Sequence, residues 1–186
     1  MNTFLAEGYK IPTESNYLNP SKLPQGETNF RILSSAIVGY EYWTNDNKPI
    51  RAREIWKKRP DDIKIKDDGT FDVKHFWAFV VWHYEDSKVK IMEVTQKTIM
   101  NGIKSLVDNA KWGDPKEYDI TLTKTGELLK TEYSTVPNPK TELQAEIIEE
   151  YKNKPVNLEA LYLGNDPFQV DGMTDEEKAE AMAIEV

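Results

Sequence analysis

The sequence contains no cysteine, and its 186 residues include only two histidines, His75 and His83. Without cysteine the chain forms no disulfide bond and offers no thiol nucleophile, and a zinc site would need carboxylates to complete it. We therefore expect no metal and no other cofactor.

Long apolar stretches are also missing. No run reaches the roughly 18 apolar residues of a membrane-spanning helix, and residues 1–10 lack the basic start and apolar stretch of a signal peptide. These absences predict a cytoplasmic protein that does not associate with a membrane.

Sequence signatures of common enzyme classes are absent as well. The chain has no G-x-x-x-x-G-K-[ST], G-x-G-x-x-G, H-E-x-x-H or G-x-S-x-G motif. Two acidic pairs, Asp61 with Asp62 and Asp67 with Asp68, resemble a Mg²⁺ site, but adjacent acids in a lysine-containing turn are usually solvated surface. We expect no enzymatic activity, and a small hydrolytic or nuclease accessory enzyme that uses these pairs is an alternative.

The charges are unevenly distributed along the chain. The net charge is −8, from 32 acidic and 24 basic side chains. Residues 141–186 hold 12 of the acids and 3 of the bases, so residues 1–140 hold 20 and 21 and are near neutral. The overall acidity argues against phosphate binding, but it belongs to the C-terminal part of the chain, and the remainder is compatible with such binding.

One strongly basic stretch, K-P-I-R-A-R-E-I-W-K-K-R, lies at residues 48–59, where six cations accompany the single acid Glu54. Aromatic residues precede it and lie within it. Proteins that bind single strands combine both kinds of group, because rings stack on unpaired bases and cations contact phosphates. Taken singly, each ring is more simply interpreted as core and each cation as solvated surface. As a cluster they predict a nucleic-acid site that includes Tyr40, Tyr42, Trp43, Lys48, Arg51, Arg53, Trp56, Lys57, Lys58 and Arg59.

The spacing of apolar residues divides the chain into strands and helices. Alternating β-branched and aromatic residues indicate strands, and apolar residues three and four positions apart indicate helices. Turn residues such as Gly126 separate paired strands. The pattern predicts strands at 29–43, 50–56, 75–85, 88–94, 118–126 and 127–136, and helices at 95–109 and 141–154.

This order predicts a mainly β protein with one helix inserted between strands and another near the C-terminus. We expect an OB-fold-like β-barrel of five to six strands, in which the inserted helix plugs one end. A small α+β sheet that is open on one side has the same order of elements and remains an alternative.

The predicted strand at 75–85 is the most apolar of the chain. Its near-continuous apolar character means either burial on both faces or an aromatic outer face. Because side chains alternate along a strand, Phe76 and Trp82 share one face, and we expect that face to contact the ligand.

The composition changes along the chain and suggests four segments. We expect a flexible arm at 1–27, an OB-fold domain at 28–140, a helical extension at 141–170 and an acidic disordered tail at 171–186. The tail either keeps the protein soluble or competes for the basic groove and recruits basic partners. Its candidate partner-binding residues are Asp175, Glu176, Glu177, Glu180 and Glu185.

Residues 28–140 resemble the single-stranded DNA-binding proteins of tailed phages, in element order the helix-destabilising proteins of T-even phages. The resemblance rests on N-F-R-I-L, H-F-W-A-F-V-V-W, K-V-K-I-M-E-V, W-G-D-P-K-E-Y-D-I-T-L-T-K-T-G and L-L-K-T-E-Y-S-T-V-P-N-P-K. It implies an OB-fold, a cationic cleft lined with aromatic residues, cooperative and sequence-indifferent binding, and an acidic C-terminal end that contacts replication and recombination proteins. By position it also implies that Phe76 and Tyr133 are base platforms.

Two features of that phage family are missing from this chain. The T-even proteins have a zinc subdomain with cysteine and histidine ligands, which a cysteine-free chain does not supply. Their N-terminal arm is basic, whereas residues 1–26 contain only Lys10 and Lys22 beside Glu7 and Glu14. We therefore do not transfer metal-dependent ordering, and we do not expect strong cooperativity from the arm.

Together these observations predict a protein that sequesters and protects single-stranded DNA during phage replication and recombination, in the cytoplasm of the host. Its partners would be single-stranded DNA, replication and recombination proteins at the acidic tail, and further copies of itself. A phage structural or assembly protein that uses the aromatic strand and acidic end for protein contacts is the main alternative. RNA binding also remains open, because stacking alone does not distinguish the two sugars.

Overall fold

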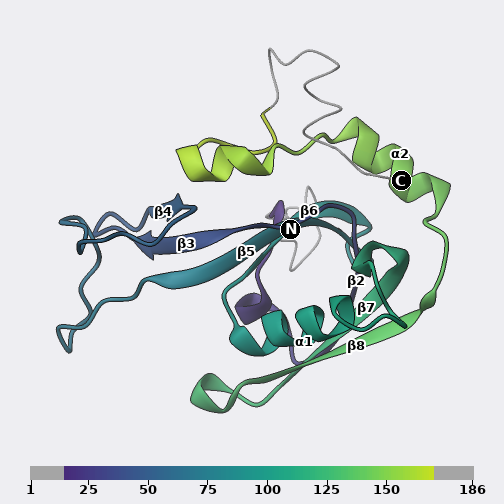
Figure 1. The fold of residues 1–186 in the computed structure, drawn as a ribbon, viewed down its shortest axis with the longest axis horizontal. Coiled ribbons are helices and arrows are strands. Elements are labelled where there is room, and N and C mark those ends of the chain that lie inside the picture. Colours follow the sequence, from purple (N-terminus) through teal and green to yellow (C-terminus); the bar gives the residue numbers. More distant parts are fainter. Residues whose placement is uncertain (1–14, 170–186) are drawn as a thin grey trace, which may run out of the picture.

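Eight strands form one mixed sheet in the computed structural model, which describes residues 15–169 (Figure 1). Two α-helices accompany it, α1 (Lys97–Val107) and α2 (Ala145–Asn153). The strands are β1 (Tyr17–Leu18), β2 (Gly26–Ile32), β3 (Ile37–Trp43), β4 (Pro49–Ala52), β5 (Lys74–His83), β6 (Lys88–Val94), β7 (Tyr118–Thr125) and β8 (Glu132–Lys140).

The sheet is open and does not close into a barrel. Its main path runs β1-β6-β5-β2-β7-β8, with β3 paired to β5 and β4 paired to β3. β6 is bordered by β1, in parallel, while β8 packs against α1, where Gly102 leaves room for Thr135. The mainly β class is confirmed, the expected barrel is wrong for this structure, and the OB-fold stays a prediction. The open sheet, named above as the alternative, is what forms.

The stretch predicted as one strand at 29–43 is broken into β2 and β3, and both pair with β5. β2 pairs with the C-terminal half of β5 and β3 with its N-terminal half. At the break, the backbone N–H of Leu33 donates to the carbonyl of Val80 (2.8 Å), and the backbone N–H of Val80 donates to Ser34 Oγ (2.9 Å). β3 and β5 therefore continue together beyond the rest of the sheet.

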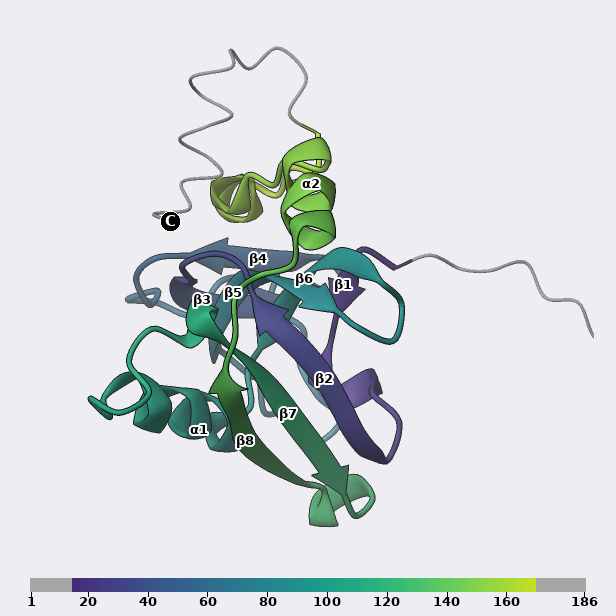
Figure 2. The ribbon, with the colours of Figure 1, turned by 90° about the vertical axis from the view of Figure 1, so that its right-hand side faces the viewer.

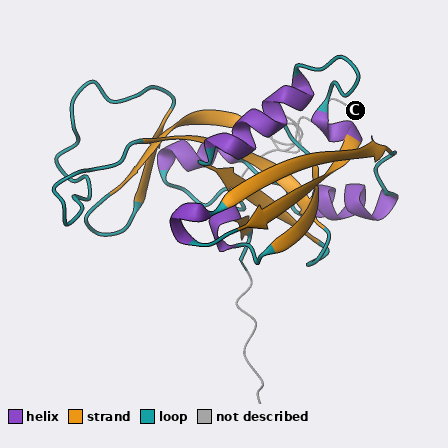
Figure 3. Cartoon of the chain, turned by 90° about the horizontal axis from the view of Figure 1, so that it is seen from below, coloured by secondary structure: helices purple, strands orange, loops and turns teal. Residues whose placement is uncertain are grey.

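We call this projecting part the wing, residues 37–78, which comprises β3, β4, the first half of β5 and the loops between them. It extends away from the body in Figures 1 and 3. β4 is shorter than expected, since the strand predicted at 50–56 ends at Ala52. Gly39 permits β4 to pair closely, because a Cβ at this position would lie 2.3 Å from the carbonyl oxygen of Ala52.

The two faces of the sheet are covered by different helices. Phe79 and Val81 of β5 pack on the face where α1 lies. Phe76, Val80 and Trp82 face the other way and are covered by α2 and the 3₁₀ helix η4 (Leu158–Leu163). The continuous apolar character of β5 thus reflects burial on both faces, one of the two interpretations given above.

A buried arginine ties the start of the C-terminal extension to the sheet. Arg31 of β2, with a side chain only 2% exposed, donates from Nε to Asp119 (2.6 Å) and from its terminal nitrogens to the hydroxyl (2.7 Å) and carbonyl (3.1 Å) of Thr141. The Tyr84 hydroxyl donates to the same Asp119 oxygen (2.8 Å). Beyond Thr141 the chain crosses to the opposite face, where α2 packs (Figure 2).

The outer strand β8 ends the sheet beside β7 (Figure 2). It contains Pro137 and Pro139, which have no backbone N–H to donate. The predicted hairpin formed by β7 and β8 is confirmed. Its turn is longer than expected and includes the 3₁₀ helix η3 (Leu128–Lys130) after Gly126.

The predicted arm at 1–27 is described only from residue 15 on. Residues 15–27 include β1 and the 3₁₀ helix η1 (Pro20–Lys22). Residues 1–14 and the predicted acidic tail at 171–186, with Asp175, Glu176, Glu177, Glu180 and Glu185, lie outside the described residues. In residues 15–169, every helix is too short or too polar to cross a bilayer.

Candidate nucleic-acid interface

Three rings line the face of the wing on the side of α1. The cross-strand pairing of β3 with β5 places Tyr40 opposite His75 and Val38 opposite Trp77. The rings of Tyr40 and His75 have centroids 5.2 Å apart, and Trp77 Nε1 donates to His75 Nε2 (3.2 Å). His75 is exposed, and the other two are half-buried. This aromatic row, Tyr40, His75 and Trp77, offers adjoining ring surfaces on an open face.

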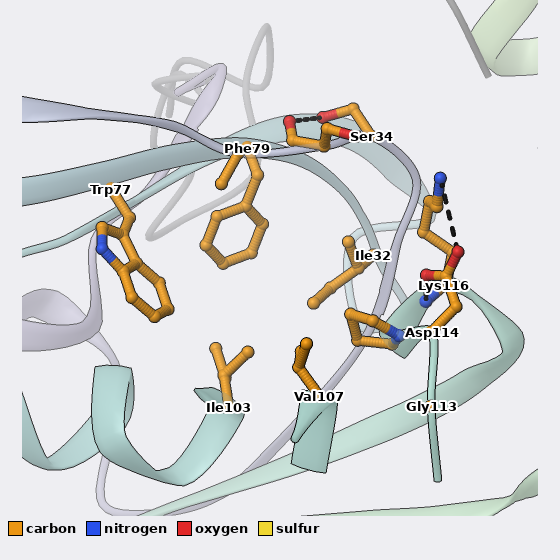
Figure 4. A pocket seen from close by; sticks show the side chains of 12 residues that line it. Ile32, Ser34, Trp77, Phe79, Ile103, Val107, Gly113, Asp114 and Lys116 are labelled. Carbon is orange, nitrogen blue, oxygen red and sulfur yellow. Dashed lines mark hydrogen bonds and ion pairs between the residues drawn. The ribbon is translucent and has the colours of Figure 1, made fainter. Parts of the chain in front are cut away.

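The aromatic row ends at an apolar hollow between β5 and α1. The hollow has a volume of about 500 Å³ and is lined by Trp77, Phe79, Ile103 and Val107 with Ile32 of β2. Figure 4 shows Trp77 at one end of it, with Asp114 and Lys116 at the other. We call this space the apolar hollow. It is large enough for small apolar groups and lies next to the aromatic row.

The opposite face of the wing carries the exposed ring of Trp43, which is 45% exposed. Trp43 borders a second hollow of about 320 Å³ together with Lys64, Lys66 and Lys74. Lys64 Nζ donates to Asn47 (2.6 Å), and Lys66 is paired with Asp72 (2.7 Å), whose hydrogen bond raises the pKa of Lys66. This face therefore combines the ring of Trp43 with lysines, two of which bind neighbouring side chains.

Two of the six cations predicted to contact phosphate are held in contacts within the protein. Arg51 is nearly buried, with a side chain 7% exposed, and pairs with Glu41 (3.2 Å) and Glu93 (2.9 Å). Burial raises the pKa of the Glu93 carboxyl, although nearby Arg51 acts in the opposite direction. Arg53 pairs with Glu159 of η4 and stacks over Tyr162 at 4.4 Å. Arg51 and Arg53, both predicted to contact phosphate, therefore form ion pairs within the protein in this structure.

The other four cations remain exposed in the loops of the wing. Lys48 lies in the loop between β3 and β4, and Lys57, Lys58 and Arg59 lie in the loop after β4. None of the four forms an ion pair within residues 15–169. Arg59 lies 5.8 Å from the centre of the exposed ring of Phe71. These side chains are available to neutralise phosphates.

Several of the predicted aromatic contacts are structural instead. Phe76 and Trp82, which were predicted to face the ligand, are 0% and 4% exposed and lie in the core under α2 and η4. Tyr42 is 6% exposed, and its hydroxyl donates to Asp62 (2.8 Å). Burial, followed by this hydrogen bond, raises the pKa of Tyr42 to about 12.

Trp56 and Tyr133 are each half-buried against other side chains. Trp56 packs edge-on against Tyr42 with ring centroids 4.8 Å apart, and this contact holds the loop after β4 on the wing. Tyr133 lies on β8, away from the wing, and packs against the core on the side of α1. Neither belongs to the aromatic row.

His75 and Trp77 belong to the candidate site but were not predicted from the sequence. The alternation of β5 separates Trp77 from the buried Phe76, but only the pairing of β3 with β5 shows that Trp77 and His75 lie beside Tyr40. The C-terminal extension covers part of the other face, including Phe76, and leaves the face with Trp77 uncovered by it. The alternation along β5 was therefore visible in the sequence, but the register that pairs β5 with β3 was not.

The acidic pairs show no arrangement typical of a metal centre. Asp62 accepts a hydrogen bond from Tyr42, and Asp68 accepts from the hydroxyl of Thr70 (2.6 Å), which lowers the pKa of Asp68. Within residues 15–169, no three His, Asp or Glu side chains are grouped so that they could hold a metal ion.

Comparison with known proteins gives one informative similarity. No protein-family model and no solved structure matches the chain. A curated protein of Escherichia phage T5, described as a probable ssDNA-binding protein, is 26% identical over 135 residues, which is 60% of this chain and 52% of the phage protein. The chain thus spans about half the length of that relative. We conclude that this chain is similar to a probable single-stranded DNA-binding protein of a phage.

Proposed function

We propose that this chain binds single-stranded DNA, with unpaired bases stacked on the aromatic row. The observation that carries the proposal is the contact between Tyr40, His75 and Trp77 on the open face of the wing. The four exposed cations of the wing loops lie on the same projecting part of the chain. The distant similarity to the T5 protein supports the same function.

Such a surface binds with little sequence preference. Stacking on an aromatic ring contributes roughly 1–3 kcal/mol per base and is available to every base, because each has a flat face. Flexible lysines contact phosphates, which carry no sequence information. We propose that the chain sequesters and protects single strands without catalysing a reaction on them, in the replication or recombination of a phage, and that its acidic tail recruits partner proteins.

The proposal predicts that tryptophan fluorescence is quenched when oligothymidylate is added. Affinity should fall steeply between 50 and 200 mM salt, as expected when phosphate contacts release counterions (about tenfold or more for several contacts). Double-stranded DNA of the same length should bind more weakly, because its bases are already stacked. A parallel titration with oligouridylate tests the preference for DNA over RNA.

Variants of the aromatic row provide the matched control for this titration. Tyr40→Ala and His75→Ala should each weaken binding about 5- to 150-fold, which corresponds to roughly 1–3 kcal/mol. Trp43→Ala removes an exposed ring from the opposite face and should change affinity less than about twofold on this reasoning. A larger loss with Trp43→Ala would place the site on the opposite face. No salt-dependent binding of the unaltered chain to any oligonucleotide would favour a structural or assembly protein.

We also propose that the acidic tail competes with DNA for the exposed cations. Six acids against Lys178 lie between residues 171 and 186. Removing residues 171–186 should therefore tighten binding, most at low salt, where charge interactions are least screened. The measurement is the same titration on the full and shortened chains. Equal affinities would reject competition and leave the tail with a solubilising role.

A further inference from the structure

The tip of the β7–β8 hairpin displays two adjacent leucines to solvent. Leu128 and Leu129 are 93% and 103% exposed. Leu128 also has a φ of +51°, in the left-handed region that residues with a Cβ adopt rarely and at a cost. Two neighbouring large apolar side chains with almost no contact to their own protein indicate a surface that meets another apolar surface.

Hydrogen bonds and a tight turn in the backbone of the tip fix the position of the two leucines. Gly126 has a φ of +74°, and a Cβ there would lie 2.1 Å from the carbonyl oxygen of Lys130, so the loop closes tightly at this position. The Thr131 side chain and backbone both donate to the carbonyl of Leu128, at 2.8 and 3.2 Å. Gln25, which precedes β2, donates to the carbonyl of Gly126. The leucines are therefore presented by a hydrogen-bonded turn.

The apolar hollow is a complementary surface on the same chain. It is lined by Ile32, Phe79, Ile103 and Val107, and its volume of about 500 Å³ accommodates the two leucine side chains. Each surface carries one charge of each sign at its edge: Glu127 and Lys130 flank the tip, and Asp114 and Lys116, which pair with each other (3.5 Å), lie at the rim of the hollow.

The two leucines do not occupy the hollow of their own chain, since both are almost fully exposed. Residues 113–116 of the hollow precede β7, whereas the tip follows it. Eight residues of strand separate them by roughly 25 Å. A contact between tip and hollow would therefore join two copies, through different surfaces on each. Such head-to-tail contacts produce an open row of molecules rather than a closed dimer.

We propose that the leucine tip of one copy inserts into the apolar hollow of the next copy bound to the same DNA strand; this inference rests on the proposed function. Two leucines bury far less than the roughly 1,200 Å² of a stable complex, so free chains remain monomeric. Binding side by side on one strand raises the effective concentration enough for a weak contact to form. Because the hollow adjoins the aromatic row, a DNA strand bound to that row would run toward the next copy.

The first test compares a short and a long strand. The unaltered chain should bind poly(dT) cooperatively and at least tenfold more tightly per site than an oligothymidylate of about 8 nucleotides, which holds one molecule. Leu128→Ser with Leu129→Ser should remove that difference and leave the affinity for the short strand unchanged. Loss of short-strand affinity would show that the leucines contact DNA, and unchanged cooperativity would show that they serve another protein; either result overturns the inference.

The second test uses the absence of cysteine. A mixture of chains carrying Leu129→Cys and Ala36→Cys, at the tip and at the rim of the hollow, should form a disulfide-linked pair on poly(dT) when a mild oxidant such as oxidised glutathione is added. Leu129→Cys mixed with Leu163→Cys, an exposed position on η4, is the control and should not. Equal cross-linking in both mixtures overturns the inference. If the unaltered chain fails to bind even the short strand, the proposed function fails; if it binds both strands equally, only this inference fails.

Discussion

Replacing Arg31 with methionine is expected to lower the free energy of unfolding by about 3–5 kcal/mol, the usual cost of removing one partner from a buried charged network. The guanidinium is 2% exposed and binds Asp119 and Thr141. Methionine fills the space but donates no hydrogen bond, so the Asp119 carboxylate loses its cation and keeps the bond from Tyr84, while the Thr141 carbonyl loses its bond from Arg31. Denaturation with guanidinium chloride, followed by circular dichroism, measures the change.

The control for this variant is Arg53→Met. Arg53 also forms an ion pair, with Glu159, but its side chain is 64% exposed. An exposed pair contributes less than about 1 kcal/mol, because water solvates both groups when they separate. Equal losses in the two variants would mean that the Arg31 network does not anchor the C-terminal extension. The expected order is a large loss for Arg31→Met and a small one for Arg53→Met.

Replacing Phe76 with alanine should also cost about 3–5 kcal/mol of stability, because it opens a cavity in a well-packed core. Phe76 is 0% exposed, its ring lies 6.2 Å from that of Tyr162, and the Arg51 guanidinium lies 5.6 Å above it. The folded fraction of Phe76→Ala should bind single-stranded DNA with the affinity of the unaltered chain. Urea denaturation and the fluorescence titration measure the two quantities on the same sample.

Phe76→Leu separates a packing role from a stacking role. Leucine keeps most of the apolar volume, so stability should fall by only about 1–2 kcal/mol. Leucine has no aromatic face, so a stacking role would cost affinity in Phe76→Leu as much as in Phe76→Ala. A loss of affinity without a loss of stability in either variant would show that Phe76 contacts the bases after all.

The sequence predicted the elements well because their signals are local. The helical spacing of Ile99 and Ile103 lies within one segment, and the structure places α1 there. The uninterrupted apolar residues of β5 predicted a strand in the same local way, but they left open burial on both faces or an aromatic outer face, and the structure shows burial on both. Turn chemistry also acts locally, and Gly126 lies at the hairpin turn with positive φ.

The features that the sequence could not predict depend on contacts between distant residues. Arg51 and Arg53 belong to the same basic stretch as Lys57, but their acidic partners Glu93 and Glu159 lie 42 and 106 positions away. Composition alone therefore could not separate the engaged cations from the free ones. Which face of β5 is open depends in the same way on where the C-terminal extension packs.

The break between β2 and β3 explains why the expected barrel was wrong. Apolar and β-branched residues continue through residues 29–43, so periodicity gave no reason to divide the strand. The division appears only when both parts pair with β5 and Ser34 bonds to Val80. It directs β3 outward into the wing, and the aromatic row exists only because of that bend.

The two prolines of β8 have a consequence for a protein that accumulates at high local concentration on a DNA strand. An outer strand with unpaired N–H groups is a template on which another chain can add a strand, and such additions lead to irreversible fibres. Pro137 and Pro139 remove two donors from this border. If copies crowd on DNA as proposed, these prolines would hinder strand addition between them, and their association would stay dissociable when the DNA is released.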